Sequence, residues 1–252
     1  MLGYEYQNHN IMFGEPSTRY ASYMGNTFRE TTYDEYKSAP QRYLRTQDFS
    51  RILFYQQILQ HILYVQGEIH LLGVANGSTL FTLAHLIEIL EPLNTSRRIV
   101  AFDTFNTQTN GDSYYPISPE DGIYYRDNPM PSCTDYEKLA SHVEQFNGCC
   151  RIHPERRIIL MPGDARKTYI DYMSNHSPLI SLVLLHIELY EVEKVVLRLA
   201  WKNMPKDSLV VSSTLGYNKS PGILRYMQEL DLVGDYKICR TQYTSKMAYI
   251  IK

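Results

Sequence analysis

The sequence predicts an α/β domain with a doubly wound, mostly parallel seven-stranded sheet, helices on both faces and a C-terminal antiparallel hairpin. Short apolar runs of strand length alternate with helical segments, which is the pattern of a parallel sheet. Two runs near the end of the chain, 236–240 and 248–252, flank a polar turn and predict the hairpin. With 252 residues the chain can bury the core of one such domain.

Hydrophobic periodicity locates the individual elements. We expect the remaining strands at 69–74, 99–102, 157–161, 180–187 and 208–211. We expect helices at 46–64, 78–90, 135–146, 165–175, 191–201 and 221–230. Gly67 ends the first helix, and Pro92 follows the second, where a helix cannot easily continue.

Two segments fall outside this alternation. Residues 1–45 are polar and rich in tyrosine, and we interpret them as an arm or lid preceding a domain at 46–252. Residues 104–132 are rich in Asn, Gly, Pro and Tyr and form a long loop insertion, a feature that is usually functional inside a compact domain.

Composition excludes several classes of protein. The formal net charge is -2, so the chain lacks the basic surface expected of a protein that binds nucleic acid or an anionic membrane. Its apolar runs are far shorter than the ~20 residues of a membrane span, and its first residues do not resemble a secretory signal. The four cysteines (Cys133, Cys149, Cys150, Cys239) match no zinc spacing and no disulfide framework, so we expect free thiols and a cytoplasmic location.

Ligands of doubly wound sheets bind beyond the carboxyl ends of the strands, where the strand order reverses. The turn after the first strand, from Gly73 to Ser78, has two glycines four residues apart, which let backbone and helix N–H groups approach a ligand. An ordinary strand-to-helix turn explains it equally well. Asp103 ends the second strand, where a carboxylate can accept both hydroxyls of a ribose or cap a helix or loop. Together they indicate a nucleoside-bearing cofactor.

The later strand ends also carry polar side chains. Asp164 could contact an adenine or cap the helix that follows. His186 and Glu188, two residues apart, would point to the same side of a strand, where the carboxylate could orient the imidazole as a general base. A purely structural histidine is an equally good interpretation. Ser213 lies after the fifth strand, where its hydroxyl could bind a substrate.

Four blocks in this order, "GVANGSTL", "RRIVAFDTF", "PGDARKT" and "HIELYEVEKVVL", resemble the signature blocks of the macrocin-type sugar O-methyltransferases. The likeness runs from about Tyr43 to Leu230. It implies the Rossmann-like fold of class I methyltransferases, S-adenosylmethionine as cofactor, a hydroxyl of a sugar or another natural product as acceptor, and a homo-oligomer.

The resemblance also implies a set of cofactor contacts. The glycine-containing loop would face the methionine portion, Asp103 would bind the ribose, and Asp164 would flank the adenine. The residues carried over to the cofactor are Gly73, Val74, Ala75, Asn76, Gly77, Ser78, Asp103, Thr104, Phe105, Gly163, Asp164, Ala165 and His186.

The chain departs from the family where the family binds a divalent metal. Leu71, His186 and the hydroxyls of 212–214 replace acidic residues, and Glu188 replaces a second aspartate. One imidazole with hydroxyls is a poor ligand set for magnesium, which prefers charged oxygens. We therefore expect no metal.

These observations predict a metal-independent O-methyltransferase acting on a small molecule. His186 would be the base, with Glu188 as its orienting partner, and the acceptor pocket would be lined by Tyr114, Tyr115, Tyr190 and Ser213. The alternative is a catalytically degenerate protein that keeps the fold as a binding, scaffold or partner subunit. A nicotinamide-dependent oxidoreductase is disfavoured because the first turn lacks Gly-x-Gly-x-x-Gly.

Overall fold

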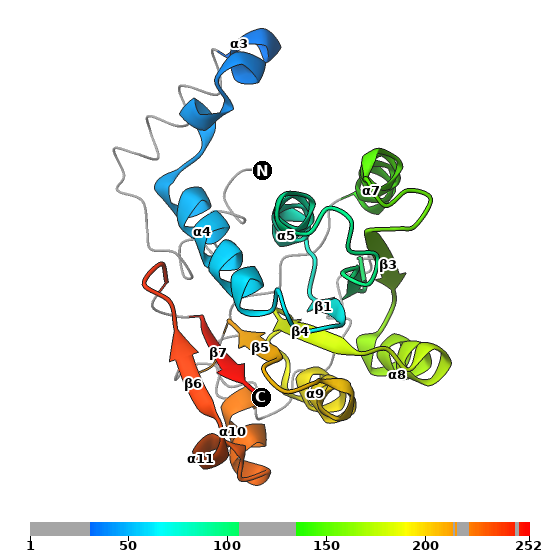
Figure 1. The fold of residues 1–252 in the computed structure, drawn as a ribbon, viewed down its shortest axis with the longest axis vertical. Coiled ribbons are helices and arrows are strands. Elements are labelled where there is room, and N and C mark those ends of the chain that lie inside the picture. The colour runs from blue at the N-terminus through cyan, green and yellow to red at the C-terminus, as the bar shows by residue number, and fades with distance from the viewer. Residues whose placement is uncertain (1–30, 106–134, 214, 216–221, 245–246) are drawn as a thin grey trace.

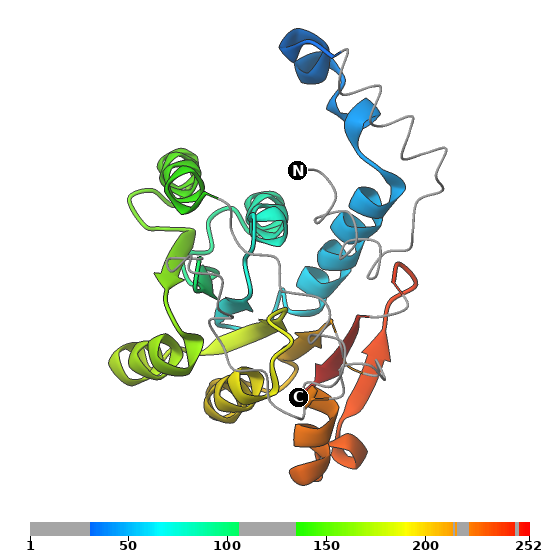
Figure 2. The same ribbon diagram turned by 180° about the vertical axis from the view of Figure 1, so that it is seen from behind.

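A computed structural model describes residues 31–105, 135–213, 215, 222–244 and 247–252. In this part of the chain, one seven-stranded sheet lies between two layers of helices (Figures 1 and 2). The strands are β1 (Glu68–Leu72), β2 (Ile99–Asp103), β3 (Ile158–Pro162), β4 (Ile180–Leu185), β5 (Leu209–Ser212), β6 (Lys237–Arg240) and β7 (Ala248–Ile251). The helices are α3 (Tyr33–Ser38), the 3₁₀ helix η1 (Pro40–Tyr43), α4 (Thr46–His61), α5 (Ser78–Leu90), α7 (Tyr136–Cys149), α8 (Ala165–His176), α9 (Tyr190–Asn203), α10 (Gly222–Glu229) and α11 (Leu232–Asp235).

The sheet order β3-β2-β1-β4-β5-β7-β6 confirms the predicted doubly wound fold. Strands β1 to β5 are parallel, and β7 pairs antiparallel with both β5 and β6, as the hairpin prediction requires. The order reverses between β1 and β4, which makes this pair the topological switch point. The bounds differ from the predicted ones by a few residues. The difference that matters most is that β4 ends at Leu185 rather than at residue 187.

The two faces of the sheet bury separate apolar cores. One core packs strand side chains such as Leu71 against α4, α5 and α7, and the other packs Leu72 and its equivalents against α8, α9 and α10. Every residue of β1 and β4 is buried, as expected for central strands of a parallel sheet with helices on both faces. The sandwich therefore leaves the strand ends as the places where polar chemistry can be exposed.

The predicted arm is described only from residue 31 onward. Helix α3 has no buried residue and projects away from the sheet beyond the start of α4 (Figure 1). A capping box begins this helix, because Thr32 and Glu35 bond to each other's backbone N–H groups. Most of the predicted loop insertion at 104–132 lies outside the described residues, as do Tyr114 and Tyr115.

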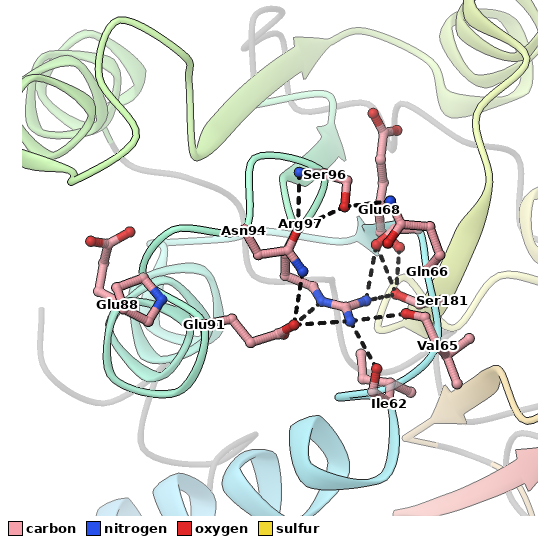
Figure 3. A network of polar contacts seen from close by, with 12 residues as sticks. Ile62, Val65, Gln66, Glu68, Glu88, Glu91, Asn94, Ser96, Arg97 and Ser181 are labelled. Carbon is pink, nitrogen blue, oxygen red and sulfur yellow. Dashed lines mark hydrogen bonds and ion pairs between the residues drawn. The ribbon is translucent and has the colours of Figure 1, made fainter.

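A buried arginine, Arg97, holds the amino-terminal edge of the sheet, opposite the carboxyl ends of the strands (Figure 3). Arg97 is 1% exposed, and its Nε donates to Glu91 at 2.7 Å. Its terminal nitrogens donate to the Ser181 hydroxyl and to the carbonyl oxygens of Ile62, Val65 and Gly67 at 2.8, 2.9 and 2.9 Å. Arg97 therefore ties the end of α4, the start of β1 and the start of β4 to the turn before β2.

Replacement of Arg97 by methionine should lower the free energy of unfolding by about 3–5 kcal/mol, because the partly buried Glu91 carboxylate loses its ion pair and several buried carbonyls lose their donor. Urea denaturation measures this loss. Arg156→Met is the matched control, since Arg156 pairs with Glu144 at the surface, where an ion pair is worth about 1 kcal/mol or less. An equal decrease in the free energy of unfolding in the two variants would show that the buried Arg97 network stabilises the fold no more than a surface ion pair does.

Candidate functional site

The carboxyl ends of the parallel strands bring the predicted site residues to one edge of the sheet. Leu72, the last residue of β1, lies opposite Phe102 of β2 and Leu185 of β4. The residues that follow these three strand positions therefore lie next to one another at the edge of the sheet. They are the glycine-containing loop 73–77, Asp103 and His186. Gly163 follows β3 and Ser213 follows β5 along the same edge.

The two glycines of the loop have conformations that other residues adopt only with strain. Gly73 has φ +89°, and a Cβ at this position would lie 2.8 Å from the carbonyl oxygen of His186. Gly77 has φ +83° and is the N-cap of α5, and a Cβ there would lie 2.8 Å from Leu139 Cδ1. The chain's own packing thus requires both glycines, whether or not a ligand is bound.

Asp103 is bonded directly to the glycine-containing loop. Its Oδ2 accepts from the backbone N–H groups of Val74 at 2.6 Å and Ala75 at 3.0 Å. Its Oδ1 accepts from the N–H of Phe105 at 2.9 Å and lies 3.5 Å from the Thr104 hydroxyl. A carboxylate has about four acceptor positions, and three backbone amides fill three of them. Asp103 therefore holds the loop in place, and its fourth acceptor position takes only the long contact from the Thr104 hydroxyl, which a ligand hydroxyl could replace.

The neighbours of Asp103 divide between core and surface. Phe105 is buried, and its ring centroid lies 4.9 Å from that of Tyr136 on α7. Asn76 and Ser78 are exposed at the start of α5. The exposed side chains of the predicted cofactor set therefore gather around the N-terminus of α5, where backbone N–H groups favour an anionic or strongly polar ligand group.

Asp164 caps α8, which was one of the two roles that the sequence left open. Its Oδ1 accepts from the N–H of Arg166 at 2.8 Å, and its Oδ2 accepts from Arg166 Nη2 at 2.7 Å. Burial pushes the pKa of Asp164 upward, but the bonds from Arg166 outweigh it and lower the pKa overall. Ala165 is fully buried, and the N–H of Gly163 donates to the carbonyl oxygen of Asp103 at 2.9 Å. The stretch 163–165 is therefore fixed beside Asp103.

His186 lies just past β4, with its ring directed toward α4. Its Nε2 is 3.4 Å from the hydroxyl of Tyr55. Burial, and then the positive charge of Arg51, lower the pKa of His186 to about 4. The imidazole is therefore neutral at physiological pH, the state in which a ring nitrogen can accept a proton.

The strand alternation that was expected to place Glu188 beside His186 does not extend that far, and this prediction was wrong. Because β4 ends at Leu185 and Glu188 has φ +59°, the chain turns between the two residues. The Glu188 carboxylate accepts from the hydroxyl of Ser213 at 2.5 Å, and its N–H donates to Glu193 at 3.1 Å. Glu188 thus joins the end of β4 to the end of β5.

Tyr190 and Ser213, both predicted to touch the acceptor, are buried. The Tyr190 hydroxyl donates to Glu229 of α10 at 2.9 Å and accepts from Lys194 at 3.1 Å, so this side chain joins α9 to α10. Besides Glu188, the Ser213 hydroxyl is 3.4 Å from the carbonyl oxygen of Leu185. Both hydroxyls have protein partners in this structure.

Two residues of α4 belong to the site although sequence reasoning did not select them. Arg51 is 4% exposed, and it donates to Asp48 at 2.7 Å and to the Ser78 hydroxyl. Tyr55, one turn later, is fully enclosed, and its hydroxyl is 3.3 Å from Thr79 Oγ1. The available signal was a pair of polar side chains four residues apart on the apolar face of an amphipathic helix.

Two further findings concern other kinds of site. Among the described residues, no group of three or more His, Cys, Asp or Glu side chains is arranged to hold a metal ion. Within the same residues, no helix combines the length and the apolar character needed to cross a membrane.

Comparison with known proteins gives matches among solved structures, whereas no family model and no curated protein matches the chain. The crystal structure of CalS11, calicheamicin methyltransferase, superposes with a TM-score of 0.82 at 24% identity, covering 95% of both chains. The apo structure of CalS11, a TDP-rhamnose 3'-O-methyltransferase of calicheamicin biosynthesis, gives a TM-score of 0.75 at 22% identity, covering 95% of this chain and 97% of that one. The O-methyltransferase NovP gives 0.60 at 12% identity, covering 81% and 79%.

The structural likeness agrees with the sequence blocks, which within the macrocin-type group resemble that same TDP-rhamnose O-methyltransferase. It extends over nearly the whole chain, including the antiparallel strands β6 and β7. The chain has the fold of the class I S-adenosylmethionine-dependent methyltransferases.

Proposed function

We propose that this protein is an S-adenosylmethionine-dependent O-methyltransferase that acts on a hydroxyl of a sugar or another natural-product intermediate. The observation that carries the proposal is the direct bonding of Asp103 to the glycine-containing loop at the switch point. It joins the two features that the sequence assigned to the cofactor, in a fold shared with CalS11.

The residues at this edge divide the work between cofactor and acceptor. The loop 73–77 and the N-terminus of α5 would hold the methionine end, Asp103 would accept from one ribose hydroxyl, and the stretch 163–165 would border the adenine. When bound, S-adenosylmethionine supplies an electrophilic methyl group. The protein then has to align the acceptor hydroxyl and receive its proton, and the neutral imidazole of His186 would take that role.

We propose that the acceptor pocket is lined by Tyr114, Tyr115, Tyr190 and Ser213. Glu188 would orient the Ser213 hydroxyl, from which it accepts a hydrogen bond. We also propose that no metal takes part, because His186 and the hydroxyls of Ser212 and Ser213 are poor ligands for a hard cation.

We further propose a cytoplasmic homo-oligomer, which light scattering during gel filtration would test. Phe49 and Leu53 lie one turn apart on α4 and are 41% and 43% exposed, while Tyr33 of α3 is 75% exposed. Large apolar side chains exposed in this way are typical of an interface. The described cysteines, Cys149, Cys150 and Cys239, are free thiols, as in reducing compartments.

Isothermal titration calorimetry with S-adenosylmethionine tests the proposal directly. We expect micromolar binding, and Asp103→Asn should weaken it by about tenfold or more, since a hydrogen bond to a charged group is worth about 1.5–3 kcal/mol. Asp171→Asn, on the exposed side of α8, is the matched control and should bind normally. Wild-type protein that gives no heat with millimolar cofactor would instead support the scaffold alternative.

His186→Gln should lower kcat by about 10²- to 10⁴-fold, the usual contribution of a general base, and leave cofactor affinity unchanged. The assay is methyl transfer to a nucleotide-sugar acceptor, with and without EDTA, which should not alter the wild-type rate. A variant with nearly wild-type activity would refute the base assignment.

His186 should also make folding stability depend on pH. Its pKa is about 4 in the folded protein and about 6.5 when unfolded, so between these values the unfolded chain binds more protons. Stability attributable to His186 is therefore complete above about pH 6.5 and is lost as the pH falls toward 4. Between pH 7 and pH 5, urea denaturation should show the wild type losing about 2 kcal/mol more than His186→Gln. Parallel losses would mean that His186 titrates normally in the folded protein.

A further inference from the structure

The contact between His186 and Tyr55 bears on which nitrogen of the imidazole is available for chemistry. Nε2 faces the Tyr55 hydroxyl at 3.4 Å, inside the packing between α4 and the end of β4. The ring centroids of Tyr55 and His186 are 6.2 Å apart at an interplanar angle of 46°, so the rings touch without stacking. Within the described residues, the ring's hydrogen bond is made by Nε2, which makes Nδ1, on the other side of the imidazole, the candidate nitrogen for an acceptor molecule.

The Tyr55 hydroxyl can act only as a neutral hydrogen-bonding group. Burial raises the pKa of Tyr55 to about 12, although the hydrogen bond between Tyr55 and Thr79 and the charge of Arg51 act in the opposite direction. Tyr55 therefore keeps its proton at physiological pH and cannot serve as the base. Its hydroxyl lies between His186 Nε2 and Thr79 Oγ1, 3.3 Å from the latter, so it can accept from one and donate to the other.

Arg51 supports the same arrangement from one turn earlier on α4. Asp48 and Ser78 hold its guanidinium, so this positive charge is fixed near His186. A nearby positive charge disfavours the doubly protonated imidazolium. The ring therefore rests with a single proton, and its place on Nδ1 or Nε2 depends on hydrogen bonding.

We propose that Tyr55 is a positioning residue that keeps the proton of His186 on Nε2, so that Nδ1 presents its lone pair to the acceptor hydroxyl. The inference rests on the proposed function, in which His186 receives the proton. In the transfer step, the acceptor oxygen forms a bond to the methyl carbon while the sulfur–carbon bond breaks and its electron pair returns to sulfur. The hydroxyl proton passes to Nδ1 and later to water, while Nε2–H continues to donate to Tyr55.

The order of donors explains why a tyrosine suits this position. As Nδ1 gains a proton, the donation from Nε2–H to the Tyr55 oxygen becomes charge-assisted and stronger. Tyr55 passes part of that polarisation to Thr79 through its own O–H. A phenylalanine would fill the same space without accepting the Nε2 proton, so the ring could exchange tautomers or rotate.

Ring ¹⁵N NMR of histidine-labelled full-length protein, recorded without cofactor or acceptor, tests the assignment. In the wild type we expect His186 to carry its proton on Nε2, with slow exchange of that proton with water. Tyr55→Phe should accelerate the exchange, and Thr79→Val should accelerate it less. Tyr64→Phe makes the same chemical change at a side chain that is 99% exposed, and it should leave the spectrum unchanged.

Kinetics provide the second readout. Tyr55→Phe should lower kcat by about tenfold, the equivalent of one hydrogen bond of about 1.4 kcal/mol, with little change in KM. A wild-type proton on Nδ1, unchanged exchange in Tyr55→Phe, or an unchanged kcat in that variant would each overturn the proposal. Because the NMR experiment needs no turnover, a His186→Gln enzyme with full activity would defeat the base role while the tautomer result still stood.

Discussion

The site depends on how closely the ends of β1 and β4 approach each other. At the switch point the segments that follow β1 and β4 diverge, although the two strands run side by side. Gly73 passes so near the His186 backbone that no side chain fits between them. This approach places the start of the glycine-containing loop against the residue that follows β4. The residues proposed for cofactor binding and for the base are thus brought together by backbone contact, before any side chain is considered.

Asp103 completes the arrangement from the other side of β1. Its carboxylate gathers amides from the loop and from the end of its own strand, so the residue that would bind the ribose also fixes the loop that would bind the methionine. The Asp103 side chain therefore has a structural role in the loop and a proposed role in binding the cofactor. A change at Asp103 cannot be attributed to ligand contact alone, and for this reason binding and stability have to be measured on the same variant.

The fold was accessible from the sequence because buried strands and amphipathic helices differ in period. The site was accessible only in part. The loop, Asp103 and His186 follow apolar runs and could be found by position, and the resemblance to the macrocin-type family agreed with them. The bond between Glu188 and Ser213 was not predicted, because β4 ends at Leu185 and Glu188 itself has φ +59°, which breaks the strand alternation. Arg51 and Tyr55 were missed because their roles depend on contacts with residues 27 and 131 positions away, which no local pattern records.

The arginines at the amino-terminal edge have a consequence for the opposite edge. Arg97 and Arg157 anchor the starts of the strands through carbonyls of the turns between them, so this edge of the sheet is held by buried side chains where no ligand is expected. The connections that leave the carboxyl ends then have freedom to vary in length and chemistry without loosening the sheet. In the proposed enzyme, a different acceptor could then be accommodated by changes in these loops alone.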